Sequence, residues 1–255
     1  MALSCYLPCL RNGVLVLFID LHTHTSYGSV CGYMTPDELI QQAKYVGLDG
    51  VCITEHNQHW DAQAIKRLRD KHDFLVIGGV EVDTAYGDIL VFGMHESVAN
   101  TYYADELRKQ VDEAGGVMIA AHPFRNESPR INSSVAALLM TLEEGCRRPV
   151  FSFVDAVEVY NGMARGDEMD FTVRVANSLN LRGTGGSDAH SILGVGGCFT
   201  VFENSIKDEA DLVEALKHGS YRPMDWRGRG QPGLPIDKGT SGNTTSQEKG
   251  SWLVL

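Results

Sequence analysis

The feature that most constrains the fold is the alternation of short apolar runs with amphipathic helical patterns along most of the chain. Such alternation is typical of a parallel β-sheet whose faces are covered by helices. About seven repeats of this unit favour a closed or nearly closed barrel over an open sheet. The β-rich runs are VLVLFID (14–20), GVCIT (50–54), FLVIGGV (74–80), DILVFGM (88–94), GVMIAAH (116–122), DAVEVY (155–160), RGTGGS (182–187) and GCFTVF (197–202).

The clearest helical pattern is TPDELIQQAKYVG, at residues 35–47. Thr35 is a capping residue, Pro36 suits the first helical position, and Glu38 completes a capping box. Apolar residues then recur at helical spacing until Gly47, which is typical of a helix end. Further helices are predicted around residues 59–72, 102–114, 134–146, 167–179 and 207–218.

The ends of the chain lack this pattern. From Arg227 onward the sequence is rich in Gly, Ser, Thr and charge and has little apolar surface to bury. Residues 227–255 are therefore expected to form a disordered tail, and residues 1–13 a short N-terminal extension. The folded domain is expected at residues 14–226.

Polar residues stand where the predicted strands end. Because a strand has a period of two, Asp20, His22 and His24 should project from one face. In a barrel the C-terminal strand ends carry the chemistry, so residues that end the other strands should lie nearby. These are Glu55 and His56, Glu81 and Asp83, His122, and Asp188 and His190.

Five of the nine histidines thus gather at one rim with two acids, and this combination favours metal ligands over structural histidines. Imidazole and carboxylate suit zinc, iron or manganese, and a carboxylate such as Glu81 can bridge two ions. Asp20 and Asp83 are expected to orient imidazoles, and Glu55 to do the same or to face solvent. The histidines interpreted as structural are His59, His72, His95 and His218.

The motifs DLHTHTSYGS, GLDGVCITEHN, GVEVD, AAHP and GGSDAH occur in this order over residues 18–222. Through this ordered set of motifs, the chain resembles the PHP (polymerase and histidinol phosphatase) superfamily of metal-dependent phosphoesterases. The resemblance implies a distorted seven-stranded (βα) barrel with the metal site at the C-terminal strand ends. The ligands that it implies are His22, His24, His56, Glu81, His122, Asp188 and His190.

The sequence departs from the family pattern at positions where many three-metal members have ligands. Ser29 replaces an aspartate, Leu90 replaces a histidine, and Asn161 stands where histidine or cysteine is often found. Each departure weakens one ion position. We therefore expect one or two divalent ions of zinc, manganese or iron, with three as the family's upper number.

The expected function is hydrolysis of a phosphomonoester or phosphodiester in a small metabolite or nucleotide. The ions would polarise the phosphoryl oxygen and lower the pKa of bound water, while Asp188 or a metal-held hydroxide takes the proton. Asp188, His190 and Arg125 are the expected catalytic residues, with Arg125 facing the phosphate. Asn57 and Asn161 are expected to hydrogen-bond the substrate, as Arg125 does.

Composition limits the partners. The net charge of −11, from 33 acidic and 22 basic residues, argues against nucleic acid binding, although a nucleotide substrate stays compatible. No run approaches the roughly 18 apolar residues of a spanning helix. Six scattered cysteines and no recognisable signal peptide point to the cytoplasm. The oligomeric state stays open.

Two other functions fit part of the pattern. An amidohydrolase-like enzyme that cleaves C–N bonds or lactones shares the barrel and the His-x-His start, but no lysine stands at a mid-barrel strand end. A non-catalytic metal-binding module would explain Ser29 and Leu90 as losses of ligands. Activity on phosphate esters against amides and lactones would separate these alternatives.

Overall fold

A computed structural model describes residues 10–11, 14–29, 31–95, 103–125 and 140–228. Its main strands form two five-stranded sheets, and β1 (Leu10–Arg11) pairs with β2 (Val14–Leu15) in a small separate ribbon. The first sheet has the order β12 (Tyr221–Asp225), β11 (Cys198–Phe202), β3 (Leu17–Thr23), β4 (Gly50–Ile53) and β5 (Leu75–Gly78). The second has the order β10 (Arg182–Gly186), β9 (Ala156–Asn161), β8 (Val117–Ala120), β7 (Gly87–Phe92) and β6 (Val80–Thr84).

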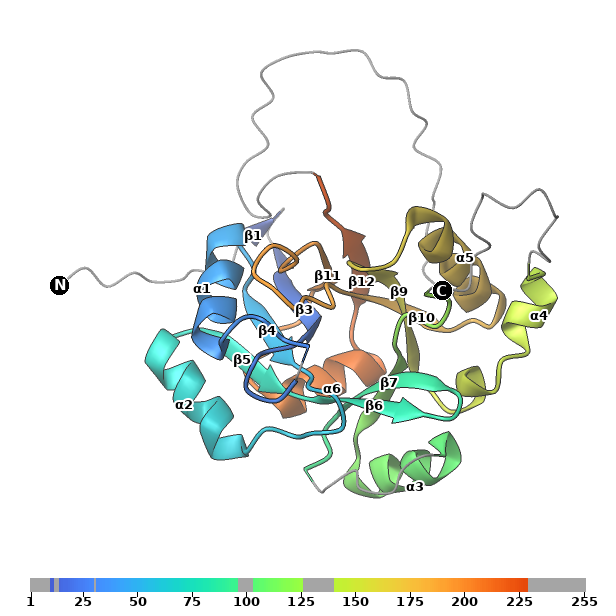
Figure 1. The fold of residues 1–255 in the computed structure, drawn as a ribbon, viewed down its shortest axis with the longest axis horizontal. Helices are drawn as coiled ribbons and strands as arrows, with labels where there is room; N and C mark the ends of the chain where they lie inside the picture. Colours follow the sequence, from blue (N-terminus) through green and yellow to red (C-terminus); the bar gives the residue numbers. More distant parts are fainter. Residues whose placement is uncertain (1–9, 12–13, 30, 96–102, 126–139, 229–255) are drawn as a thin grey trace, which may run out of the picture.

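Both edge strands of the second sheet, β6 and β10, lead to contacts with the first sheet. Figure 1 shows the arrangement of the two sheets. On one side only Gly79 separates β5 from β6, and Glu81 N–H donates to the Glu55 carbonyl oxygen at 3.1 Å. On the other side the chain after β10 meets β3, where Asp188 N–H donates to the His22 carbonyl oxygen at 2.8 Å. The predicted α/β fold is confirmed, whereas the described strands form two sheets and no closed barrel is seen among them.

Part of the sheet is antiparallel, where the alternating pattern predicted parallel strands. The loop between β6 and β7 contains only Ala85 and Tyr86, and it leads into Gly87 at φ 111°. So short a connection can join only antiparallel neighbours, because a parallel crossover needs a dozen or more residues. Strand β11 also runs antiparallel to β3, and β12, which the sequence did not predict, pairs antiparallel with β11.

The helices form near their predicted positions, although residues 134–139 of the helix predicted at 134–146 lie outside the described residues. Most helices lie at the periphery, whereas the last, α6 (Glu209–His218), lies near the centre of the view and packs against strands of both sheets (Figure 1). In the first helix the predicted capping box is present: Thr35 Oγ1 accepts from Glu38 N–H at 3.2 Å, and the Glu38 carboxylate accepts from Thr35 N–H at 2.8 Å. Gly47 ends this helix at φ 86°. The helices are α1 (Pro36–Val46), α2 (Ala62–His72), α3 (Ala104–Ala114), α4 (Leu142–Cys146), α5 (Gly166–Ser178) and α6 (Glu209–His218), with a 3₁₀ turn at Pro149–Ser152.

Leu90 is a core residue. It lies opposite Glu81 in the register of β6 and β7, and it is fully buried with Leu212 and Leu216 of α6 in one apolar cluster. An imidazole at this position would have to be buried among these apolar side chains. With leucine instead of histidine at position 90, this side chain belongs to the apolar core.

The predicted domain ends can be compared with the structure only in part. Residues 1–9, 12–13 and 229–255, which contain most of the predicted extension and tail, lie outside the described residues. Arg227 belongs with the domain, because its guanidinium pairs with Asp225 at 2.9 Å and donates to the Ala164 carbonyl oxygen at 2.6 Å. In the described part of the chain, none of the helices has the length and apolar character needed to cross a membrane.

Candidate metal centre

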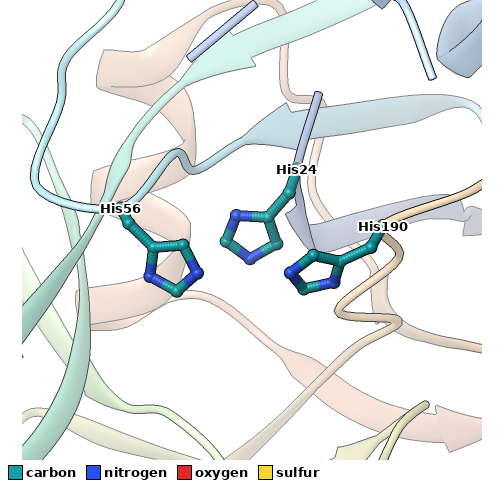
Figure 2. A group of neighbouring side chains, drawn as sticks. All are labelled: His24, His56 and His190. Atoms are coloured by element: carbon teal, nitrogen blue, oxygen red, sulfur yellow. The ribbon is translucent and has the colours of Figure 1, made fainter. Parts of the chain in front are cut away.

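The ends of β3, β6, β8 and β10 and the segment after β4 meet at one rim and bring all seven predicted ligands together. His22, Glu81 and His122 form one group of ligand atoms within 4.8 Å of one another. His22, His24 and Asp188 form a second group, and His24, His56 and His190 a third. Figure 2 shows the His24 ring between those of His56 and His190, with ring centroids 4.6 and 4.4 Å from His24.

Several of these residues leave their strands in an unusual backbone conformation. His122 and Asp188 have φ values of 28° and 53°, in the left-handed region that non-glycine residues seldom adopt. Such conformations persist where the surrounding structure fixes them, and they cluster at functional sites.

The Glu81 carboxylate tests whether these residues fit a metal ion. Its Oε2 atom is buried and has no hydrogen-bond partner among the described residues. The nearest ring nitrogens of His22, His24 and His56 nevertheless lie 3.3, 3.2 and 3.1 Å from it. Buried polar atoms are normally hydrogen-bonded, so an acceptor that ring nitrogens surround without such bonds fits a shared cation.

Four atoms are spaced as one coordination set: His22 Nε2, His24 Nε2, Glu81 Oε2 and Asp188 Oδ1. The two Nε2 atoms are 3.0 Å apart, and those of His22 and His24 lie 3.5 and 3.3 Å from Asp188 Oδ1. Together with the Glu81 distances, five of the six separations lie between 3.0 and 3.5 Å. Ligands about 2.0–2.1 Å from a tetrahedral zinc are ~3.3 Å apart, so the set matches one ion position.

The other oxygens of the same two carboxylates face a further imidazole. His122 Nε2 lies 3.0 Å from Glu81 Oε1 and 3.6 Å from Asp188 Oδ2. A carboxylate can bridge two ions, whereas one imidazole nitrogen binds only one. The arrangement therefore places a further set of possible ligand atoms beside His122.

Glu158 of β9 is the site residue that the sequence reading missed. It is buried, its Oε1 lies 3.0 Å from His22 Nδ1, and its Oε2 accepts from His122 N–H at 3.0 Å. An acceptor on Nδ1 fixes the proton there and leaves Nε2 as the ligand atom. A charged residue inside the apolar run DAVEVY was the available signal.

Arg125 and Asn161 both bind Asp188. The Arg125 guanidinium pairs with Asp188 Oδ2, and Asn161 Nδ2 donates to the same oxygen at 3.2 Å and to Glu158 Oε2 at 2.9 Å. Asn161 is buried beneath the site, whereas Arg125 is a quarter exposed at its rim. Arg125 is thus positioned beside the candidate ligands, as the sequence predicted.

Asp20 has a different role from the one expected, and one of the two roles expected for Glu55 is excluded. Asp20 orients backbone rather than an imidazole: its carboxylate accepts from the N–H groups of His22, Ser187 and Gly196. Its complete burial raises its pKa to about 6. Glu55 is fully buried, so the expectation that it could face solvent is wrong.

Asp83 and Asn57 lie at the exposed edge of the cluster. Asp83 Oδ1 lies 3.5 Å from His56 Nδ1, which is compatible with its predicted orienting role. Asn57 Nδ2 donates to Asp83 Oδ2 at 2.9 Å, and Asn57 Oδ1 accepts from Asp83 N–H at 3.0 Å. Both polar groups of the Asn57 amide are thus engaged with the neighbouring strand.

Charges at the centre are strongly coupled. Burial lowers the pKa of His22, but Asp188, Glu81 and Glu158 outweigh it and raise that pKa well above its usual value. Burial raises the pKa of Glu81, but His22 and His122 outweigh it and hold that pKa well below normal. The acids are therefore ionised and attract positive charge, which protons or divalent ions can supply in competition.

The other four histidines lie apart from this centre. His72 Nε2 lies 2.5 Å from Asp37 Oδ1, and the mostly exposed His95 lies 3.5 Å from Glu209. His59 is largely buried; this burial and the nearby His95 lower its pKa to about 4. None of the four belongs to a metal-binding group among the described residues, in agreement with the sequence interpretation.

A pocket of about 540 Å³ opens beside the centre. His122 and Arg125 line it together with Tyr86, Asp88 and Arg148. The pocket can therefore hold a small organic group next to the cluster.

Two protein families match parts of this chain. The PHP domain family matches residues 20–145, and the PHP-associated family matches residues 170–221. The uncharacterised protein MJ1587 of Methanocaldococcus jannaschii is 27% identical over 155 residues, which are 57% of this chain and 82% of that protein.

Solved structures resemble the fold. A two-domain protein of Bacteroides vulgatus, described as containing a predicted PHP-like metal-dependent phosphoesterase, has a TM-score of 0.62 at 19% identity, over 84% of this chain and 66% of that one. PsfC of Pseudomonas syringae has a TM-score of 0.57 at 20% identity, over 82% of this chain and 91% of that one. The ordered motifs, the two family matches and the clustered ligands together establish that this chain belongs to the PHP family.

Proposed function

We propose that this protein is a metal-dependent phosphoesterase that hydrolyses a small phosphorylated metabolite or nucleotide. The observation that supports this most directly is the pair of carboxylates, Glu81 and Asp188. Both oxygens of Glu81 face imidazoles, and Asp188 faces an imidazole through one oxygen and Arg125 through the other. Two ions that share carboxylates suit the displacement at a phosphorus atom, and a guanidinium suits a phosphate oxygen.

We propose that His22, His24, Glu81 and Asp188 would hold one ion, and that His122 and Glu81 would hold a second. His56 and His190 flank His24 and offer two further imidazoles. Zinc, manganese or iron fits such nitrogen and oxygen donors. When bound, the ions polarise the phosphoryl oxygen and lower the pKa of a water molecule toward neutrality.

The residues of the chain then bind and orient the substrate. Arg125 holds a non-bridging phosphate oxygen, and its pairing with Asp188 fixes the guanidinium at the rim of the pocket. Asp188 Oδ2 lies beside Arg125, where it would accept the proton of the attacking water. The organic part of the substrate occupies the pocket beyond His122.

The test is a screen of metal-reconstituted protein. We expect turnover of phosphomonoesters or phosphodiesters after loading with zinc, manganese or iron, and its loss in the Asp188→Ala and His22→Ala variants. Glu214→Gln, on the exposed face of α6, serves as the control. Turnover of amides or lactones alone would identify an amidohydrolase-like enzyme, and metal binding without turnover of any ester would favour a non-catalytic module.

A further inference from the structure

Ser29 and Glu55 lie behind His24, on the side away from the candidate metal position. His24 Nδ1 lies 3.3 Å from Ser29 Oγ, and the Ser29 hydroxyl donates to the Glu55 carboxylate. All three side chains are buried. The contacts therefore form a continuous chain from the imidazole to an acid.

The direction of these hydrogen bonds follows from chemistry. An ionised carboxylate only accepts, so the single hydroxyl proton of Ser29 must point to Glu55. Ser29 Oγ then has only lone pairs to offer, and His24 Nδ1 must carry a proton in order to bind it. In neutral imidazole the other nitrogen, Nε2, is left with the free lone pair.

The carboxylate of Glu55 is itself held in place. Thr25 donates to it through its hydroxyl and its backbone N–H, the latter at 3.2 Å, and Trp60 Nε1 donates at 3.2 Å. Gly28 supplies the room: a Cβ atom there would lie 2.5 Å from Glu55 Cγ. The loop after β3 is thus built around this acid.

The neighbouring candidate ligand, His22, also has a buried acid at its Nδ1 atom. His22 Nδ1 lies 3.0 Å from Glu158, so each of the two imidazoles in the four-ligand set is backed by a buried acid, directly for His22 and through a hydroxyl for His24. We propose that Ser29 and Glu55 are positioning residues that fix the His24 tautomer with Nδ1 protonated and Nε2 free to bind metal. This inference rests on the proposed metal site.

NMR of the ¹⁵N-labelled, zinc-loaded protein reads the tautomer without reference to catalysis. We expect His24 to bind zinc through Nε2 and to show an Nδ1–H signal that exchanges slowly with water. In Ser29→Ala this signal should exchange faster, and the zinc dissociation constant should rise about 10- to 100-fold, as for other residues that orient metal ligands. Ser178→Ala, an exposed serine of α5, is the matched control.

A double variant tests whether the two residues act in series. Ser29→Ala should add nothing to the loss of zinc affinity caused by Glu55→Met, because either change removes one member of the same chain of hydrogen bonds. Zinc bound to His24 Nδ1, or unchanged zinc affinity in Ser29→Ala, would overturn the proposal while leaving phosphoesterase activity possible. Conversely, the expected NMR signals in a protein without esterase activity would support the positioning role and reject the proposed function.

Discussion

At the scale of single residues, the centre depends on acids that never touch the candidate metal position. Glu158 accepts from His22 Nδ1, from the His122 backbone and from Asn161, so three parts of the site share one buried carboxylate. Such partners orient the ligand ring and raise the basicity of its other nitrogen.

Glu158→Gln should therefore weaken metal binding. The amide keeps the size of the side chain but loses the negative charge opposite His22 Nδ1, and we expect roughly a tenfold or greater rise in the zinc dissociation constant. Competition titration with a chromophoric chelator measures the zinc dissociation constant, and Glu214→Gln, an exposed position of α6, is the control. Equal affinities in the two variants would contradict the role of Glu158.

A second prediction at this scale concerns Arg125 and the rate of catalysis, whereas metal binding should not depend on this residue. Arg125→Ala should lower kcat/KM by a factor that corresponds to about 2–3 kcal/mol, the usual size for a hydrogen bond to a charged group. Arg125→Lys should recover only part, since an ammonium does not reproduce the planar guanidinium. Metal content, measured by elemental analysis, should stay unchanged; kinetics equal to wild type would return Arg125 to a surface role.

At the scale of elements, the site requires β10 to pass very close to β3. A Cβ atom on Gly186 would lie 2.5 Å from His22 Cβ and 2.5 Å from Glu158 Oε1. Neither atom is the free end of a flexible side chain, because His22 is on a central strand and Glu158 is held by its hydrogen bonds. The absence of a side chain at Gly186 lets the two sheets meet at the ligands.

Gly186→Ala should thus separate His22 from Glu158. We expect a loss of about 1–3 kcal/mol in the free energy of unfolding, the usual cost of overpacking, together with weaker zinc binding. Urea denaturation and zinc titration measure the two effects. Gly166→Ala is the matched control, because a Cβ there meets nothing within 4 Å; similar behaviour of the two variants would show that the close approach is unimportant.

At the scale of the whole molecule, the centre joins the two sheets through charge. Ligands from both sheets meet there, and opposite charges dominate over burial in raising the pKa of His22 and His24 and lowering that of Glu81 and Asp188. In the metal-free protein, imidazoles with raised pKa contribute stability at low pH that is lost as the pH rises through their folded-state pKa. Metal binding has the opposite dependence, because it must displace those protons.

The stabilisation by metal should therefore grow with pH. We expect the difference in Tm between zinc-loaded and chelator-treated protein to be small at pH 5.5 and to increase toward pH 8. At a free zinc concentration of about 100 times the dissociation constant the gain is about 2.7 kcal/mol. Thermal unfolding at matched free zinc concentrations checks this, and a difference independent of pH would show that the imidazoles do not bind the ion.

The sequence by itself determined much of this protein. The capping box of α1, the positions of most strands and helices, and the convergence of seven ligands could all be predicted, because periods of two and 3.6 residues and the residues at strand ends are local properties. The antiparallel course of β7 could also have been derived, since the short loop before it excludes a crossover.

Only the tertiary structure decided how the ligands are held. Glu158 and His22 are 136 residues apart, and Glu55 and Ser29 are 26 apart, so no local pattern links them. A buried acid can face the apolar core, a metal or an imidazole, and the residues next to it in the sequence do not distinguish these cases. In His22 and His24, the hydrogen bond made by one ring nitrogen determines whether the other nitrogen is free to bind metal. The hydrogen-bond acceptors, Glu158 and Ser29, come from β9 and the loop after β3, so they reach the imidazoles only in the folded protein.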